Sequence, residues 1–306
     1  MRHGIITILC TFSCCCASFA RSGNTAMPFL RTDFNPVTAA MAGAGSLHSI
    51  SYASFGNSSV IPLSDKRFDA TASYMCWAPD GLETTGYDAG IAGKVTEKIG
   101  ISGGVYFGNG TTYEIIGENG RHEGTFRPSE FLVNAGFAYR INDNLSAGVN
   151  LHYAGQSLAK DADIKAFAGD LNVTYSHGGL SVSGGVKSLG STVKSSSGDS
   201  YGLPASISAA AAYLIRSGED HGILLALDGD CFLAGAFSAA AGVQYGFRDM
   251  LFVRAGAHMA SKTAPIASHV ALGCGVKFAG FHIDAAYLTA NETIGNGFTV
   301  GIGYCF

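Results

Sequence analysis

The chain is poor in charge and has no long apolar run beyond its first residues. Only 14% of its 306 residues are charged, well below the roughly 25% of soluble domains. A run of about 18 apolar residues, which a transmembrane helix needs, does not occur in the body of the chain. The net charge is −4 and there is no basic cluster, so we expect no nucleic-acid partner.

Motifs of catalysis and metal binding are missing as well. The sequence contains no HExxH pattern, no nucleophile elbow and no Ser/His/Asp arrangement. The cysteines beyond the N-terminal region are widely scattered and form no CxxC pair, at Cys76, Cys231, Cys274 and Cys305. We therefore predict a protein that is not an enzyme and that uses no cofactor or metal.

The N-terminus predicts export. Arg2 and His3 form a short polar start, residues 4–19 are apolar, and small residues precede a cleavage position after Ala20. Residues 1–20 are thus predicted to be a secretory signal peptide. Cysteines at 14–16 leave lipid attachment open as an alternative, although Phe12-Ser13 before Cys14 is a poor context for it.

Strand-like alternation fills the chain from Arg67 onward, with no amphipathic helix. Most of the strands are close to the 9–11 residues that a tilted membrane strand needs. Short connections alternate with mostly longer ones, as in outer-membrane barrels. Fourteen strands are predicted, at 67–77, 86–95, 99–116, 131–140, 145–156, 166–176, 180–189, 205–215, 222–232, 237–246, 251–260, 268–277, 281–288 and 297–306.

The last predicted strand carries the most specific pattern. Five apolar side chains alternate with small or polar ones, so one face of the strand is wholly apolar. This stretch is similar to the C-terminal signature of outer-membrane proteins, whose closing strand faces lipid; an ordinary sandwich strand is the alternative. The signature residues are Phe298, Val300, Ile302, Tyr304 and Phe306.

Together these patterns predict an all-β, transmembrane antiparallel β-barrel of about 14 strands in the outer membrane of a Gram-negative cell. Residues 21–65 are rich in Ala, Gly and Ser instead, and we predict that they form an N-terminal plug in the lumen of a barrel spanning 66–306. Asp228 and Asp230 share a strand face, where salt bridging is favoured over calcium. The candidate lumen or plug contacts are His48, Asn57, Lys94, Arg140, Asp228, Asp230, Arg254 and Lys277.

In several stretches the chain resembles the PorV/PorQ group of outer-membrane proteins, itself similar to FadL-type fourteen-stranded barrels. The resemblance lies in Pro28-Phe29-Leu30 followed by the Ala/Gly-rich residues 39–45, in Ser73-Tyr74-Met75-Cys76-Trp77, and in residues 124–131 (GTFRPSEF). Where the family usually has an Asn-Pro pair, this chain reads Phe55-Gly56-Asn57-Ser58-Ser59. No single motif is very specific; their order and spacing carry the resemblance.

The resemblance implies a non-enzymatic part of type IX protein secretion that binds secreted cargo and passes it to the surface attachment machinery. The alternative is a FadL-like passive transporter of hydrophobic small molecules, with the N-terminal segment as its hatch. In both cases the expected partners include outer-membrane lipid and the barrel assembly machinery. Secreted cargo proteins are expected only in the first case.

Overall fold

The computed structural model describes residues 25–77, 84–116, 120–159, 162–194, 198, 200–289 and 295–306. The predicted signal peptide therefore lies outside the described residues. Within them, no helix has the length and apolar character to cross a membrane.

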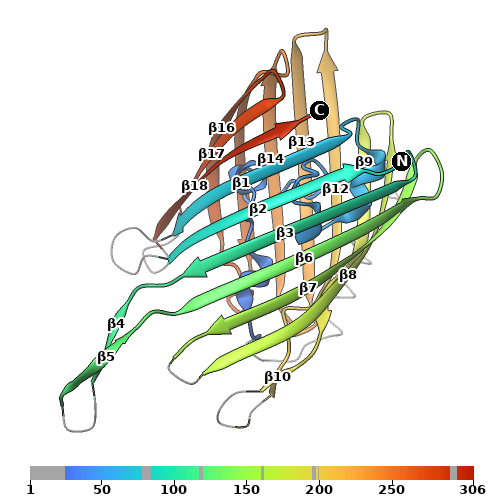
Figure 1. Cartoon of the computed structure of the whole chain (residues 1–306). Coiled ribbons are helices and arrows are strands. Elements are labelled where there is room, and N and C mark those ends of the chain that lie inside the picture. The colour runs from blue at the N-terminus through green and yellow to red at the C-terminus, as the bar shows by residue number, and fades with distance from the viewer. Residues whose placement is uncertain are drawn as a thin grey trace.

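Fourteen antiparallel strands close into one barrel, in which each strand pairs with its neighbours and β1 pairs with β18 (Figure 1). This confirms the predicted all-β, fourteen-stranded barrel. The strands of the wall are β1 (Phe68–Trp77), β2 (Thr84–Lys94), β3 (Ile99–Asn109), β6 (Ser129–Arg140), β7 (Leu145–Ser157), β8 (Asp163–His177), β9 (Leu180–Gly190), β12 (Ser206–Ser217), β13 (His221–Phe232), β14 (Phe237–Phe247), β15 (Leu251–Ala260), β16 (His269–Phe278), β17 (Phe281–Thr289) and β18 (Asn296–Cys305).

The predicted long strand at 99–116 is wrong in one respect. It divides into β3 and a separate β4 (Tyr113–Ile116), which pairs with β5 (His122–Phe126) in a hairpin beyond the barrel rim (Figure 1). Pro128 stands opposite the break, where the N–H of Gly110 donates to its carbonyl at 2.9 Å. Proline has no N–H to continue the ladder, so the barrel pairing stops there. A second small pair, β10 (Val193–Lys194) with β11 (Ser200–Tyr201), was also not predicted.

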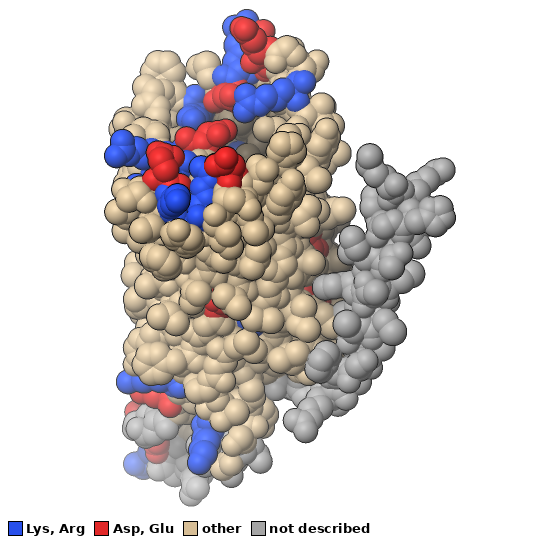
Figure 2. All heavy atoms as spheres, turned by 90° about the vertical axis from the view of Figure 1, so that its right-hand side faces the viewer, with Lys and Arg blue, Asp and Glu red and all other residues tan. Residues whose placement is uncertain are grey.

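Side chains alternate between the lipid face and the lumen along each strand. The five signature residues, four in β18 and Phe306 directly after it, are between 38% and 62% exposed and face outward, whereas Thr299 is only 2% exposed and faces the lumen. Figure 2 shows the result on one face: a band almost free of charged residues, with Lys, Arg, Asp and Glu gathered above and below it. An apolar band of this kind is what the hydrocarbon of a bilayer requires.

The barrel closes where the end of the chain pairs with its first strand. The N–H groups of Arg67 and Phe68 donate to the carbonyl of Phe306 at 2.8 and 2.9 Å, and the N–H of Phe306 donates to the carbonyl of Phe68 at 3.1 Å. The rings of Phe68 and Phe306 stack with centroids 5.3 Å apart. Backbone pairing therefore continues to the last residue, leaving no open strand edge there.

The two ends of the barrel differ in their connections. At one end, which we call the turn end, tight turns join the strands. Gly178 and Gly179 have φ of 59° and 85°, and Ala279 and Gly280 have φ of 51° and 84°. Two successive residues with positive φ match the right-handed twist of paired strands in a hairpin. The other end, the loop end, carries the longer connections and the β4–β5 hairpin.

Residues 25–66, which we call the lumenal segment, lie inside the barrel (Figure 1). The segment contains η1 (Pro28–Arg31), α2 (Pro36–Ala40), η2 (Ala53–Phe55) and η3 (Ser58–Leu63). Helix α2 packs on β15 to β18, and η3 packs on β3, β6, β7 and β8 across the lumen. Wall glycines allow this close approach: a Cβ at Gly256 would collide with the backbone of Met41, and one at Gly104 with the ring of Phe55.

Candidate functional site

Three cavities lie in a row along the lumen. The loop-end cavity has a volume of about 380 Å³, the central cavity about 130 Å³ and the turn-end cavity about 620 Å³. Thr32, Asp33 and Ile266 line both of the first two, while Asn35 and Ser49 line both of the last two. The lumenal segment thus contributes the boundaries between neighbouring cavities.

The loop-end cavity is mainly apolar, and all its charged groups are acidic. Its larger apolar residues include Met75, Trp77 and Leu288, and its carboxylates are Asp33 and Glu130; no Lys or Arg is among the described residues that line it. Tyr106 donates a hydrogen bond to Glu130 Oε1 at 2.8 Å. The cavity therefore combines a mainly apolar wall with two acidic side chains.

Two histidines with tilted rings lie side by side here: His269 lines this cavity and His258 lines the central cavity. The ring centroids of His258 and His269 lie 5.0 Å apart. The centroids of His269 and Trp77 lie 6.2 Å apart, in an edge-to-face arrangement. The Nδ1 atoms of both histidines lie within hydrogen-bonding distance of the carbonyl of Ala267, at 3.1 and 2.9 Å. Since a carbonyl accepts only, we assign the proton of each neutral ring to Nδ1.

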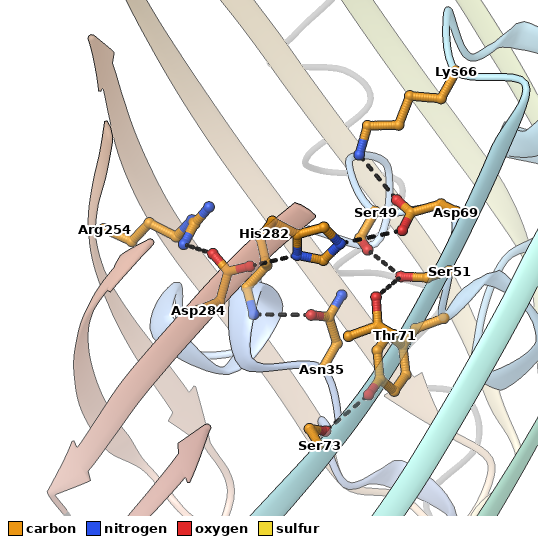
Figure 3. A network of polar contacts seen from close by, with 12 residues as sticks. Asn35, Ser49, Ser51, Lys66, Asp69, Thr71, Ser73, Arg254, His282 and Asp284 are labelled. Atoms are coloured by element: carbon orange, nitrogen blue, oxygen red, sulfur yellow. Dashed lines mark hydrogen bonds and ion pairs between the residues drawn. The ribbon is translucent and has the colours of Figure 1, made fainter. Parts of the chain in front are cut away.

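The turn-end cavity contains a chain of paired charges (Figure 3). Arg254 on β15 contacts Asp284 on β17 at 2.6 Å, and Asp284 in turn contacts His282 Nδ1 at 2.9 Å. His282 reaches Asp69 on β1 at 3.4 Å, and Asp69 pairs with Lys66 at 2.9 Å. The chain of contacts joins three strands near the closing seam to the end of the lumenal segment.

His48 and Lys277, both predicted as lumen contacts, line the same turn-end cavity. Gln244 connects His48 to the charged chain, because its side chain lies 3.3 Å from His48 Nε2 and accepts from Arg254 Nε at 2.6 Å. Three of the predicted residues, His48, Arg254 and Lys277, are therefore brought together at this end of the lumen.

Asp228 and Asp230 bind the lumenal segment rather than a shared ligand. Asp230 forms an ion pair with Arg31 at 2.6 Å. Asp228 accepts from the N–H of Gly45 at 3.0 Å and from the hydroxyl of Ser46. Each carboxylate thus has its own partner: a cation for Asp230 and neutral donors for Asp228. Nowhere in the part of the chain that the structure describes do three or more metal-ligating side chains gather.

Asn57 is buried and anchors the lumenal segment to β8 and β9. Its amide donates to Ser183 at 3.1 Å and to Thr174 at 3.3 Å, and its carbonyl oxygen accepts from the N–H of Ser59 at 3.2 Å. A short polar side chain at this position fastens η3 to the wall. This gives Asn57 a structural role in the described contacts.

Two predicted contacts lie elsewhere. Arg140, at the end of β6, donates to the carbonyl of Asp143 at 2.8 Å, so its guanidinium binds the following turn and not the lumen. Lys94, the last residue of β2, lines none of the three cavities. Both residues end a strand, where an inward-pointing position no longer leads into the lumen.

A buried cluster around Tyr52 was not predicted from the sequence. The Tyr52 hydroxyl donates to Asp88 and contacts Ser73 at 2.8 Å, and Ser73 contacts Asp88 at 2.6 Å. Burial and the nearby Asp88 raise the pKa of Tyr52 well above its usual value, so its hydroxyl keeps its proton. Sequence patterns show that Ser73 and Asp88 face inward, but not that Tyr52 meets them.

No protein family model and no curated protein sequence matches the chain. Solved structures do match. The Ralstonia pickettii toluene transporter TbuX aligns with a TM-score of 0.63 at 12% identity, over 90% of this chain and 99% of that chain. The Pseudomonas putida toluene transporter TodX gives 0.62 at 14%, over 94% and 99%, and a Pseudomonas aeruginosa FadL homologue gives 0.58 at 11%, over 93% and 99%.

These structural neighbours are outer-membrane barrels of the FadL type. At such low identity they establish a shared fold and nothing finer. The FadL-like part of the predicted resemblance therefore agrees with the structure, whereas membership of the PorV/PorQ group stays a prediction.

Proposed function

We propose that the protein is a passive outer-membrane channel for hydrophobic small molecules. The observation that carries this proposal is the row of three cavities through the lumen of a FadL-type barrel, beginning with an apolar one at the loop end. Two of the neighbours of this fold are named toluene transporters. This was the alternative interpretation of the sequence, and it now takes the first place.

The volumes of the cavities indicate where a molecule would be held during passage. Ligand sites commonly measure about 300–1,000 Å³, so the loop-end and turn-end cavities, about 380 and 620 Å³, fit a small molecule. The central cavity, about 130 Å³, is too small by this measure. In the proposal, the lumenal segment is the hatch that must shift for a molecule to pass, and no chemical step is needed.

Membrane orientation follows from the connections. Outer-membrane barrels place short turns in the periplasm and longer loops outside, so the loop-end cavity would open to the exterior. The predicted signal peptide and barrel assembly machinery would deliver the chain to this membrane. A hydrophobic molecule would enter from outside and leave toward the periplasm.

Uptake of a labelled monoaromatic compound by cells tests the proposal. Leu288→Trp should fill the loop-end cavity and lower uptake several-fold, because Leu288 is 7% exposed and lines that cavity. Leu272→Trp is the matched control, since Leu272 is 63% exposed on the lipid face. Uptake that is unchanged after deletion of the whole gene would contradict the proposal.

A role in type IX secretion is the second candidate, and one observation favours it. The β4–β5 hairpin extends beyond the barrel rim (Figure 1) and exposes Tyr113 and Ile116 by 43% and 57%. Such apolar side chains outside the membrane band could contact secreted cargo. A photocrosslinker at Ile116 should then trap secreted proteins in cells. Normal secretion in a deletion strain, together with lost uptake, would exclude this candidate and leave the channel.

A further inference from the structure

We propose that the loop-end cavity selects hydrophobic molecules that carry an ammonium group and disfavours those that carry a carboxylate. This inference rests on the proposed channel function and specifies its substrate class. It is argued from the charges that line the cavity, the partners of those charges and one buried hydroxyl.

The titratable side chains of the cavity lining are two carboxylates, Tyr106 and one histidine, His269. Asp33 from the lumenal segment and Glu130 from β6 both line it, and the described lining includes no Lys or Arg. A carboxylate ligand would therefore meet two carboxylates and neither a Lys nor an Arg in the described wall. An ammonium ligand would meet two opposite charges in surroundings less polar than water, where attraction is stronger.

Asp33 is available to a ligand. No hydrogen bond or ion pair joins its carboxylate to any residue that the structure describes. The nearest basic residue in sequence, Arg31, is already paired with Asp230 at 2.6 Å. Asp33 also lines the central cavity, so a cation held there would stand at the boundary between the two cavities.

Glu130 is held in place but keeps accepting capacity. Tyr106 donates to its Oε1 at 2.8 Å, and Gln156 lies 3.4 Å from its Oε2. Each carboxylate oxygen accepts more than one hydrogen bond. Both partners of Glu130 are neutral, so its negative charge remains without a cation among the described contacts.

A buried hydroxyl points to the same ligand. Thr299 is 2% exposed and lines the cavity, yet its Oγ1 has no hydrogen-bond partner in the described structure. Buried polar groups are usually hydrogen-bonded, and an exception needs an explanation. An N–H donor of a bound ammonium would satisfy Thr299, while Met75, Trp77 and Leu288 would cover the apolar body of the molecule.

Fluorescence of Trp77 provides the test, because it is the single tryptophan of the chain and lines the cavity. Benzylamine, toluene and benzoate share one ring and differ in charge. With the purified protein in detergent at pH 7, we expect benzylamine to bind about tenfold more tightly than toluene, which is ~1.4 kcal/mol. Benzoate should bind more weakly than toluene.

Variants assign the preference to named residues. Asp33→Asn should remove most of the difference between benzylamine and toluene, and Glu130→Gln a smaller part. Asp65→Asn is the matched control, since Asp65 lines the turn-end cavity instead, and it should keep the full preference. If Asp33→Asn fails to fold, Thr84→Lys decides: it adds a cation to the cavity lining and should shift the preference toward benzoate.

The outcomes separate the two proposals. Toluene binding without any preference for benzylamine would overturn this inference and leave the channel standing. Absence of binding of all three compounds at the Trp77 cavity would overturn both. A preference for benzylamine that persists in Asp33→Asn and in Thr84→Lys would show that the carboxylates do not cause it, and would overturn the inference as well.

Discussion

The two larger cavities lie in one lumen, but their carboxylates differ in whether they have basic partners. In the turn-end cavity, Asp284 and Asp69 are both bound by basic partners, at 2.6 and 2.9 Å. In the loop-end cavity, Asp33 and Glu130 have no basic partner among the described contacts. The same strand, β1, contributes Asp69 to one cavity and Trp77 to the other. The difference therefore lies in the partners of each carboxylate, such as Arg254 on β15 and Lys66 at the turn end.

Paired and unpaired charges have different consequences. A buried charge that is paired and hydrogen-bonded fixes the elements that carry it, here β15, β17 and β1 around the seam. An unpaired carboxylate forms no such link between elements, and its charge is free to attract a ligand. Under the proposed function, the turn-end cavity holds the barrel and lumenal segment together, and the loop-end cavity recognises the ligand.

The largest expected effect comes from removing a cation at the turn end. Arg254→Met leaves Asp284, which is 4% exposed, without its ion pair to Arg254, and breaking a buried pair costs about 3–5 kcal/mol. Asp33→Asn should change stability far less, because no ion pair is lost. Denaturant unfolding in lipid vesicles, followed by Trp77 fluorescence, measures both variants. The double variant Arg254→Met with Asp284→Leu should recover most of the loss; equal losses in the two single variants would end the distinction between the cavities.

A smaller effect is expected where the lumenal segment separates the cavities. Gly256→Val would push a side chain into the backbone of Met41, and overpacking of this kind costs about 1–3 kcal/mol. The displaced segment should raise the ion conductance of single channels in planar bilayers. Gly184→Val is the control, because a Cβ there meets nothing nearer than 3.9 Å. Equal conductance of the two variants would mean that the segment does not limit passage.

Much of the wall could be predicted from the sequence, because the period of two along a strand is a local property. The boundaries at Leu251 and Phe281, for instance, agree with β15 and β17. The break after Asn109 was missed, since it depends on Pro128 in the partner strand. Local alternation cannot reveal which residue stands opposite.

The candidate site was less predictable for the same reason. Alternation indicates that Asp228 and Asp230 face inward, but their partners in the lumenal segment come from a segment without periodicity. Arg31 reaches Asp230 across a large separation in sequence, and no local pattern encodes that contact. Asp33 was overlooked because an isolated carboxylate in an irregular segment carries no signal; only the cavity around it makes it notable.

The smallest expected effect is a pH dependence that belongs to the loop-end cavity alone. Burial raises the pKa of Asp33 above its usual value, although His258, His269, Lys187 and Arg31 oppose the shift. Asp33 attracts an ammonium only when ionised, so the attraction is present above the raised pKa and is lost as the pH falls through it. An ammonium stays charged throughout, as a lysine with pKa about 10.4 does.

Benzylamine affinity should accordingly fall between pH 8 and pH 5 by roughly fivefold, or about 1 kcal/mol, while toluene affinity changes little. Trp77 fluorescence titrations at each pH measure both. Asp33→Asn should remove most of this fall, because the titrating carboxylate is then absent. A rise in benzylamine affinity on acidification would mean that Asp33 does not determine binding in the loop-end cavity. The two ends of the lumen would then differ in shape and not in the charge available to a ligand.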